Sequence, residues 1–218
     1  RPLSEGIPKA LLTIKGKLLI DLILANLNNS NLENINLICS IKHEKFWLEY
    51  KKNSQFDVNL HFEHEKLDTA GFVVQNINNF SDKFLCMNGD LLIEMNFNSF
   101  LEVANNSKNS TICSIPVDDP SRYGVLELDG TKIINFIEKP EDMKFGNNIS
   151  LGVYCLHKKD IKKIESKLEI PSSFEKNVFP ELADNYLLDC FIVEGIMLDV
   201  GTRESYICLL YTSDAADE

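Results

Sequence analysis

The sequence predicts an α/β protein with a mostly parallel, mixed sheet, helices on both faces, and a second half rich in hairpins. Up to about residue 120, short apolar strands alternate with amphipathic helical stretches. This alternation is typical of a parallel sheet that helices cover on both sides. After that point strands follow one another directly, which indicates antiparallel pairing. A chain of 218 residues can bury a full core, so one domain is expected.

The first half supplies the alternating elements. Continuous apolar runs predict buried strands, and apolar positions at helical spacing predict helices. We expect Thr69 to cap the helix that begins there. In order, the predicted elements are a strand at 35–40, a helix at 43–52, a strand at 58–64, a helix at 69–80, a strand ending in a turn at 83–90, a helix at 97–107 and a strand at 110–117.

The second half opens with a hairpin. The segment "YGVLELDGTKIINFIEKP" (123–140) contains two strands about an Asp-Gly turn, which is a strong hairpin signal. The elements predicted after it are a strand at 149–157, helices at 158–168 and 174–184, strands within 186–195 and 196–202, and a helix from about Arg203.

Charge and cysteine usage exclude several classes of protein. The net charge is −11, with 22 basic and 33 acidic residues, which argues against a nucleic-acid binder and against a polybasic membrane-surface protein. No apolar run reaches the roughly 18 residues of a membrane span. The six cysteines stand singly, without a C-x-x-C pair, so neither a zinc site nor a disulfide framework is predicted. Reduced thiols favour a cytoplasmic protein.

Two acidic residues stand where predicted strands end. Asp90 closes the segment "MNGD", and Asp199 lies in "IMLDVGT", two residues before Gly201. Ligands of open α/β sheets bind beyond the carboxyl ends of strands, and carboxylate oxygens suit a divalent metal. The two acids could therefore meet at one Mg²⁺. On position alone, a turn aspartate and a charge that favours the following helix dipole explain them equally well.

Two lysines occupy constrained positions. Lys9 follows Pro8, which limits where the chain directs it, although most lysines are simply solvated. Lys139 follows Glu138 at the end of the hairpin's second strand. Neighbouring side chains of a strand face opposite ways, so either one could point inward unless the strand ends in a twist. A solvated pair is the alternative.

Glycines and one helix start give weaker signals. The tetrapeptide "DTAG" (68–71) joins a strand to a helix, where backbone N–H groups attract phosphate or a base edge. Gly124 and Gly152 interrupt strands, which either a close approach of backbone to ligand or a β-bulge would explain. Arg122 could pair with phosphate, but an exposed loop arginine explains it as well.

Taken together, these segments resemble the sugar-1-phosphate nucleotidylyltransferases, also called nucleotide-sugar pyrophosphorylases. The resemblance is closest to the mannose-1-phosphate and heptose-1-phosphate guanylyltransferases, and it implies a Rossmann-like fold with a sugar-binding lobe. It runs from residue 1 to about residue 207 and is carried, in order, by "RPLSEGIPKALLTIKGKLLI", "LDTAG", "MNGD", "RYGVLELDG" with "FIEKP", "SLGVY", "FEKNVFPELA" and "MLDVGTRESY".

The sequence departs from the family pattern in four places. Ala10 and Leu18 stand where proline is usual. Asp68 replaces the usual glycine of "LGTAG", which could change the base preference, and "SLG" at 150–152 replaces "NAG", so sugar contacts could differ.

The resemblance also bears on both ends of the chain. It implies that a first strand and a G-x-G-T-R phosphate loop are missing before Arg1, and the 218 residues alone are then expected to be inactive or nearly so. The nucleotidyltransferase domain is predicted at 1–207. The ending "CLLYTSDAADE" (208–218) resembles the translation of a sequencing-library adapter, with a genuine acidic tail as the alternative.

The resemblance implies a role for each candidate residue. Lys9, Asp90 and Lys139 would be catalytic, and Asp90 and Asp199 would hold Mg²⁺. The remaining assignments are Lys9, Thr69, Ala70, Gly71, Asn88 and Gly89 for the nucleotide, and Gly124, Glu138, Lys139, Ser150 and Gly152 for the sugar phosphate.

The implied reaction joins an NTP, with GTP favoured, to a sugar 1-phosphate and releases pyrophosphate. Neither nucleic acid nor membrane is an expected partner, and a homo-oligomer is left open. Three alternatives remain at the level of sequence: a uridylyl-, thymidylyl- or cytidylyltransferase of the same fold, a non-catalytic homologue that binds a nucleotide sugar and regulates a partner, and a plain α/β interaction domain.

Overall fold

The computed structural model describes residues 6–27, 30, 32–141 and 143–199. The chain divides into two compact units, and each unit is assembled from separate stretches of sequence. Unit 1 comprises Arg1–Glu65, Asn88–Phe97 and Gly195–Glu218, and unit 2 comprises Lys66–Met87 and Asn98–Glu194. The predicted helix from Arg203 and the tail at 208–218 lie outside the described residues, and the domain expected at 1–207 stays a prediction.

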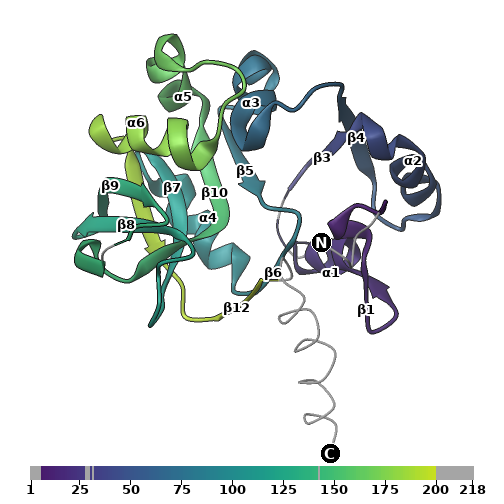
Figure 1. The fold of residues 1–218 in the computed structure, drawn as a ribbon, viewed down its shortest axis with the longest axis horizontal. Coiled ribbons are helices and arrows are strands. Elements are labelled where there is room, and N and C mark those ends of the chain that lie inside the picture. Colours follow the sequence, from purple (N-terminus) through teal and green to yellow (C-terminus); the bar gives the residue numbers. More distant parts are fainter. Residues whose placement is uncertain (1–5, 28–29, 31, 142, 200–218) are drawn as a thin grey trace, which may run out of the picture. The chain divides into compact units, whose positions relative to one another are not determined.

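Unit 2 is built on a six-stranded mixed sheet (Figure 1). Its strands, in sheet order, are β5 (Lys83–Met87), β10 (Asn148–His157), β7 (Ser110–Pro116), β11 (Leu188–Ile192), β9 (Lys132–Glu138) and β8 (Gly124–Asp129). The α/β class with a mixed sheet is confirmed. The sheet is less parallel than the alternation of elements predicts, because the long strand β10 inserts between β5 and β7 and runs against both. Within this sheet, only β7 and β11 pair in parallel.

Helices cover both faces of the unit 2 sheet, as expected. They are α3 (Asp68–Gln75), α4 (Phe97–Asn106), α5 (Lys158–Ile164) and α6 (Phe179–Asp184). Cys190 of β11 belongs to the core formed with α3, α5 and α6. Its neighbour Phe191 points to the opposite face, because side chains alternate along a strand. There the ring of Phe191 lies 5.6 Å from that of Phe100 in α4.

An aromatic cluster forms the centre of the unit 2 core. A one-turn π-helix, Phe174–Val178, leads directly into α6. The rings of Phe174 and Phe179 stack with centroids 5.4 Å apart, and Tyr154 of β10 meets Phe179 edge-on at 4.7 Å. Tyr154 and Phe179 are almost completely buried. This packing fixes the segment before α6 against β10.

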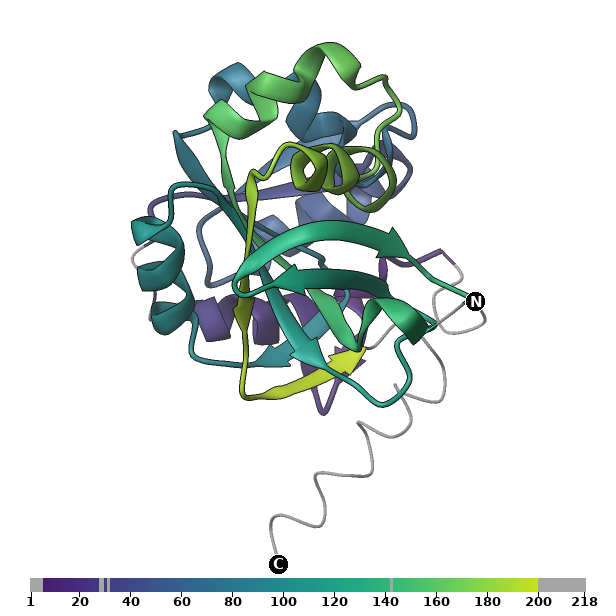
Figure 2. The same cartoon turned by 90° about the vertical axis from the view of Figure 1, so that its left-hand side faces the viewer.

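The hairpin predicted at 123–140 is confirmed. Strands β8 and β9 pair antiparallel, and Gly130 turns the chain with a φ of +61° (Figure 2). The register shifts between Glu127 and Leu128, which leaves Ile134 of β9 as an extra residue. Such a bulge bends a strand and increases its twist.

Unit 1 contains short paired strands and two helices. They are β1 (Thr13–Ile14), β2 (Lys17–Leu18), β3 (Ile35–Ser40), β4 (Val58–Glu63), β6 (Leu91–Glu94), β12 (Ile196–Asp199), α1 (Leu19–Leu27) and α2 (Glu44–Asn53). Strands β3 and β4 pair in parallel through the crossover helix α2, as the sequence predicts. The hydroxyl of Tyr50 in α2 donates a 2.8 Å hydrogen bond to Asp21 in α1.

The start of α3 differs from its prediction. Leu67 occupies the position before the helix, no side chain caps it, and Asp68 adopts a left-handed φ of +64°. The expected cap by Thr69 is therefore wrong: its hydroxyl bonds instead to residues near position 174. The helix also ends early, at Gln75, and a 3-10 turn at Ile77–Asn79 completes the predicted segment.

Candidate active site

Lys9 stands in a short 3-10 turn of unit 1. The turn, Lys9–Leu11, begins after Pro8, and the N–H of Leu12 donates to the carbonyl of Lys9 at 3.0 Å. The N–H of Leu19 then donates to the carbonyl of Leu12 at 2.9 Å, which attaches the turn to the start of α1. The backbone of Lys9 is thus fixed, while its side chain remains 46% exposed.

The ammonium of Lys9 lies beside Asp90. Lys9 Nζ donates to Asp90 Oδ2 at 3.1 Å, and the Asp90 side chain is 37% exposed. Asp90 closes the turn that follows β5, together with the half-buried Asn88 and the exposed Gly89. A Cβ atom added at Gly89 would meet only Ala10 Cβ, at an ordinary 4.0 Å. The space over this glycine is open to a ligand.

Strand pairing brings Asp199 to the same place in unit 1. Strands β6 and β12 run antiparallel, and Asp199 lies opposite Leu91, the residue directly after Asp90. Directly opposed residues of antiparallel strands have Cα atoms about 4.5–5.5 Å apart. The two predicted metal ligands, remote in the sequence, are therefore neighbours along the backbone at one end of this pair.

The residues at this end of β6 and β12 fit a magnesium ion. Mg²⁺ prefers oxygen ligands and is commonly held by one or two carboxylates, with substrate phosphates and water completing its shell. Asp90 offers a partly exposed carboxylate, and the register sets the backbone of Asp199 opposite the next residue, Leu91. Among the side chains that the structure describes, no group of three or more His, Cys, Asp or Glu residues forms a closed metal cage. An open site of two carboxylates is the arrangement expected for an ion shared with a substrate.

Gly124 and Glu138 face each other on the hairpin of unit 2. They are register partners on β8 and β9. A Cβ atom at Gly124 would come within 2.5 Å of the Phe136 ring and 3.3 Å of Glu138 Oε2. Only glycine fits at position 124, because the Phe136 ring packs against it, and its contact with a ligand stays a prediction.

Lys139 leaves the strand by a left-handed turn. Its φ is +49°, its N–H donates to the carbonyl of Tyr123 at 2.9 Å, and the buried Pro140 follows. Its ammonium consequently returns to the side of Glu138, with Nζ 3.0 Å from Glu138 Oε1. The strand therefore ends in a twist, which is one of the possibilities that the sequence allowed, and the charged groups of Glu138 and Lys139 lie on the same side.

Ser150 of β10 lies beside Gly124 and Glu138, and these three residues form a row across neighbouring strands. Ile149 pairs with Val125 of β8, and extending that register by one residue sets Ser150 beside Gly124. The pairing of β10 with β7 is interrupted between Ser150 and Tyr154, where Gly152 has a φ of +67°. A β-bulge therefore explains Gly152, and the structure brings Gly124, Glu138 and Ser150 together on neighbouring strands.

The predicted nucleotide loop at 69–71 is closely tied into unit 2. Ala70 and Gly71 are buried, and a Cβ at Gly71 would strike Leu67 Cβ at 2.7 Å, so packing within the protein requires this glycine. The N–H of Ala70 donates to the Ser172 carbonyl at 2.8 Å, and the N–H of Thr69 donates to Asp68 Oδ1 at 3.2 Å. These two N–H groups have internal acceptors, and the side chain of Asp68 is exposed.

Glu175 and Tyr154 are residues that sequence reasoning missed. Glu175 Oε2 accepts hydrogen bonds from Thr69 Oγ1 at 2.8 Å and from Ser173 Oγ at 2.7 Å. Burial raises the pKa of Tyr154, and the carboxylates of Glu175 and Glu138 raise it further, whereas a hydrogen bond with Ser150 opposes the shift. The segment "FEKNVFPELA" carried the resemblance, but nothing in its spacing indicated these contacts.

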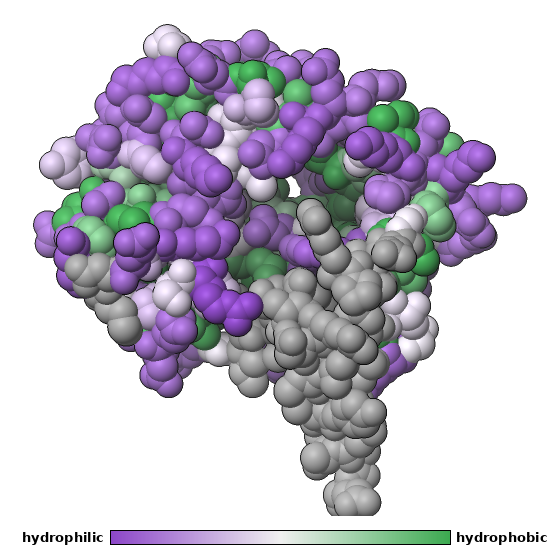
Figure 3. Space-filling model, viewed as in Figure 1, coloured by the Kyte–Doolittle hydropathy of each residue, from purple (hydrophilic) through white to green (hydrophobic). Residues whose placement is uncertain are grey.

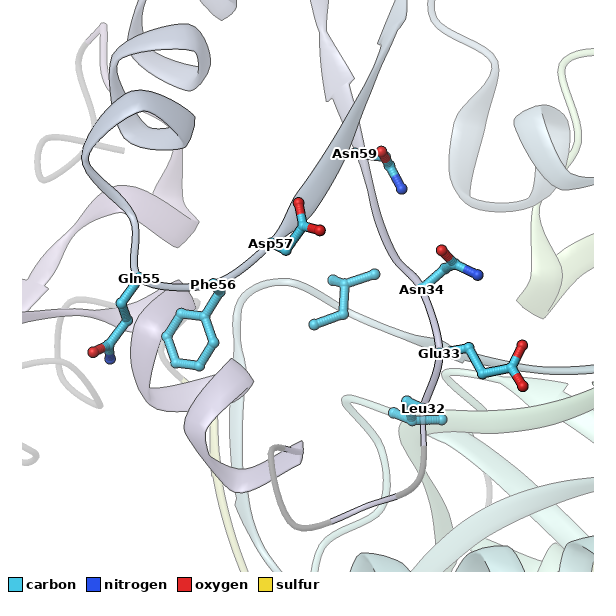
Figure 4. A pocket seen from close by; sticks show the side chains of 8 residues that line it. Leu32, Glu33, Asn34, Gln55, Phe56, Asp57 and Asn59 are labelled. Atoms are coloured by element: carbon cyan, nitrogen blue, oxygen red, sulfur yellow. The ribbon is translucent and has the colours of Figure 1, made fainter.

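A hollow of about 240 Å³ lies elsewhere in unit 1. Figure 4 shows its lining, which comes from the segments that lead into β3 and β4. The lining residues are Leu32, Glu33, Asn34, Ile35, Gln55, Phe56, Asp57 and Asn59. It therefore lies at the amino ends of these parallel strands, whereas ligands of open α/β sheets bind at the carboxyl ends. None of the predicted site residues lines it.

The surface drawn in Figure 3 is largely hydrophilic, with hydrophobic side chains in small groups. Among the described residues, no helix combines the length and the apolar character needed to cross a membrane.

Each unit holds an exposed lysine beside a carboxylate, Lys9 with Asp90 in unit 1 and Lys139 with Glu138 in unit 2, and such lysines suit phosphorylated substrates. The family model described as "Nucleotidyl transferase" matches residues 1–213, and the chain belongs to this family. A mannose-1-phosphate guanyltransferase of Saccharomyces cerevisiae is 31% identical over 229 residues, which cover 99% of this chain and 62% of the yeast protein. The catalytic subunit beta of the Drosophila melanogaster mannose-1-phosphate guanylyltransferase is 30% identical, over 98% of this chain and 60% of that protein. The chain thus spans about three fifths of the length of these curated relatives.

Solved structures show the same fold. HddC from Yersinia pseudotuberculosis, in a complex with GMP-PN, is 25% identical and superposes with a TM-score of 0.76 over 94% of this chain and 89% of that chain. A UDP-glucose pyrophosphorylase from Acinetobacter baumanii is 16% identical, with a TM-score of 0.80 over 96% of this chain and 86% of that chain. The predicted Rossmann-like α/β fold is confirmed.

Proposed function

We propose that the protein transfers a nucleotidyl group from an NTP, with GTP favoured, to a sugar 1-phosphate of the mannose or heptose type, releasing pyrophosphate. The observation that carries the proposal is the convergence of Lys9, Asp90 and Asp199 in a chain of the nucleotidyl transferase family. The preference for GTP and mannose 1-phosphate is supported by the names of the curated relatives.

Lys9 serves the nucleotide in this proposal. Its ammonium lies 3.1 Å from Asp90, and both side chains are partly exposed. An exposed ion pair contributes little to stability, so triphosphate oxygens can compete with Asp90 for the ammonium at low cost. A lysine suits this role, because it is a compact point charge on a flexible stem.

Asp90 and Asp199 would hold Mg²⁺. When bound, such an ion neutralises phosphate charge and orients the attacking and leaving oxygens for an in-line displacement. The protein contributes the backbone register of β6 and β12, which sets Asp199 opposite Leu91, the residue after Asp90. Gly89 leaves room above the same turn for the nucleotide.

The residues of the hairpin serve the acceptor. Glu138 can accept hydrogen bonds from sugar hydroxyls, while Lys139, 64% exposed, can pair with the sugar phosphate. Gly124 and Ser150 lie beside Glu138 on the neighbouring strands β8 and β10. The phosphate oxygen of the sugar would attack the α-phosphorus directly, so catalysis depends on positioning and on charge neutralisation, without a covalent enzyme intermediate.

A panel of nucleotides and sugar 1-phosphates tests the proposal. The protein is expressed from its whole reading frame, each NTP is combined with each sugar 1-phosphate, and pyrophosphate release is measured. We expect the highest kcat/KM with GTP and mannose 1-phosphate or a heptose 1-phosphate. Turnover only with UTP, TTP or CTP would replace the guanylyl assignment by another member of the same family.

The panel also separates enzyme from regulator. A non-catalytic homologue would bind GDP-mannose without releasing pyrophosphate from any pair. That result, obtained with a protein whose circular dichroism shows it to be folded, would contradict the transferase proposal. The 218-residue chain assayed beside the whole protein tests the further expectation that this stretch alone has little activity.

A further inference from the structure

Glu175 makes contacts that the proposed reaction does not explain. It lies half-buried in the π-helix Phe174–Val178 of unit 2. Its Oε2 atom accepts two hydrogen bonds, from Thr69 Oγ1 at 2.8 Å and from Ser173 Oγ at 2.7 Å. Hydrogen bonds to carboxylates are about twice as strong as those between neutral groups. One carboxylate oxygen therefore joins the start of α3 to a segment more than a hundred residues away.

The first turn of α3 depends on this segment for its position. The carbonyl of Ser172 accepts from the N–H of Ala70 at 2.8 Å, and the N–H of Ser172 donates to the Leu67 carbonyl at 2.9 Å. The N–H of Phe174 donates to Thr69 Oγ1 at 2.9 Å. The Thr69 hydroxyl thus both accepts and donates within the protein. The Thr69 hydroxyl is therefore not available to a ligand. The position of the first turn of α3 decides which groups of the loop at 69–71 a ligand can contact.

Phe174, the residue before Glu175, connects this segment to β10. Phe174 packs against Tyr154 with ring centroids 5.6 Å apart. Glu175 and Glu138 both act on the Tyr154 hydroxyl, raising its pKa beyond the effect of burial, and Ser150 hydrogen-bonds to the same tyrosine. The segment that carries Glu175 is thus joined to α3 by hydrogen bonds and to Tyr154 of β10 by the packing of Phe174.

We propose that Glu175 is a positioning residue for the nucleotide: its carboxylate holds Thr69, and with it the first turn of α3, in the orientation that the nucleotide meets. This inference rests on the proposed function, which gives the loop at 69–71 to the nucleotide. Glu175 itself touches no reacting atom. Its loss should weaken nucleotide binding and leave the sugar phosphate side nearly unchanged.

Two substitutions of Glu175 distinguish the loss of its hydrogen-bond acceptor from a general structural effect. Glu175→Leu removes the acceptor, and Glu175→Gln keeps a carbonyl oxygen that both hydroxyls can reach. We expect Glu175→Leu to raise the Kd for GTP, measured calorimetrically with Mg²⁺ and without sugar phosphate, by about 10-fold, as losing a hydrogen bond to a charged group would. Glu175→Gln should remain within about 3-fold of wild type. The KM for the sugar 1-phosphate should change less than about 2-fold.

The matched control is Glu181→Leu. Glu181 is a glutamate of α6 that pairs with Lys167 at the surface of the same unit, at 2.5 Å. It should leave the Kd for GTP unchanged. Hydrogen exchange gives a second readout that needs no activity: amides at 68–72 should exchange faster in Glu175→Leu, whereas those of Glu181→Leu should match wild type.

Thr69→Val and Thr69→Ser test the same bond from its other end. Thr69→Val should weaken GTP binding by as much as Glu175→Leu does. The double variant should bind GTP no more weakly than either single variant. Thr69→Ser keeps the hydroxyl and should bind GTP like wild type. This pair also serves if Glu175→Leu does not fold. A Glu175→Leu protein that binds GTP like wild type would overturn the inference, as would equal losses for both substrates. If Glu175→Leu weakens GTP binding but no variant or wild type releases pyrophosphate, only the proposed transferase activity is contradicted.

Discussion

The two groups of candidate residues are held in different ways. In unit 1, Lys9 and Asp90 stand on turns, next to strands of two to four residues, and their side chains are 46% and 37% exposed. In unit 2, Gly124 is buried and Glu138 is only 22% exposed, and both lie on the six-stranded sheet over an aromatic core. The charges that would exchange partners with phosphates are exposed, whereas the groups that would shape a sugar site are fixed by packing.

This contrast predicts that substitutions in unit 1 change activity without changing stability. Asp90→Asn should lower kcat/KM by about 100-fold or more, because it would remove a proposed ligand of the Mg²⁺ ion that would stabilise the transition state. Its thermal unfolding midpoint should remain near that of wild type, because an exposed ion pair contributes little. Pyrophosphate release and calorimetry measure the two effects. Asp57→Asn, at an exposed aspartate of the same unit, is the control; a loss of both activity and stability in Asp90→Asn would break the comparison.

A pair of glycine substitutions sharpens the comparison. Gly124→Ala should destabilise the protein by about 1–3 kcal/mol, because overpacking against the Phe136 ring forces the hairpin to shift. Gly89→Ala should cost little stability, since its Cβ would meet nothing closer than 4.0 Å. Urea unfolding measures both. We further expect Gly89→Ala to raise the KM for nucleotide and Gly124→Ala to raise that for the sugar phosphate. Equal stability of the two variants would contradict the assignment of the tight contact to unit 2.

Asp68 is a strained residue of unit 2. Its left-handed φ of +64° favours glycine, so Asp68→Gly should raise the free energy of unfolding by about 0.5 kcal/mol, the relief of strain being partly offset by the entropy of glycine. The ratio of KM values for GTP and UTP should also change, because the side chain of Asp68 is exposed. Tyr186→Gly, at another left-handed residue of unit 2, is the control for the base ratio. If Asp68→Gly leaves the ratio of the KM values for GTP and UTP unchanged, Asp68 does not contribute to the choice of base.

The smallest effect concerns a buried histidine of unit 2. Burial lowers the pKa of His157, the charges of Lys83 and Lys159 lower it further, and Asp160 opposes them. The unfolded chain therefore binds this proton more readily, so stability is complete above about pH 6.5 and declines as the pH falls toward the lower folded value. The decline is at most about 1.4 kcal/mol per pH unit for one proton.

Urea unfolding between pH 5 and pH 8 measures this decline. His157→Asn should flatten it, whereas the same change at the exposed His64 should not. A pH dependence identical in wild type and His157→Asn would show that other groups cause it.

The sequence predicted what local patterns determine. Strand β3 begins and ends where its apolar run predicts, and the glycine after Asp129 predicts the hairpin turn. Long-range pairing was not accessible in this way. Nothing local shows that β10 runs between β5 and β7, because that arrangement depends on contacts between remote segments.

The candidate site follows the same division. Strand ends and glycines indicated Asp90, Asp199 and Gly124, and the resemblance supplied their roles. The orientation of Lys139 depends on a left-handed backbone, which a lysine rarely adopts, so alternation along the strand could not predict it. The error at Thr69 has a similar cause: a capping pattern reads only neighbouring residues, whereas its hydroxyl bonds to Glu175.

The antiparallel pairing of β6 with β12 makes the proposed metal site sensitive to the length of strand β12 as well as to its composition. Inserting one residue within β12, between Met197 and Leu198, would preserve all the acidic and basic groups, yet it would slide Asp199 by one position, or about 3.4 Å, relative to Leu91. Relatives that keep every charged residue but differ in length here would be expected to lose metal-dependent turnover.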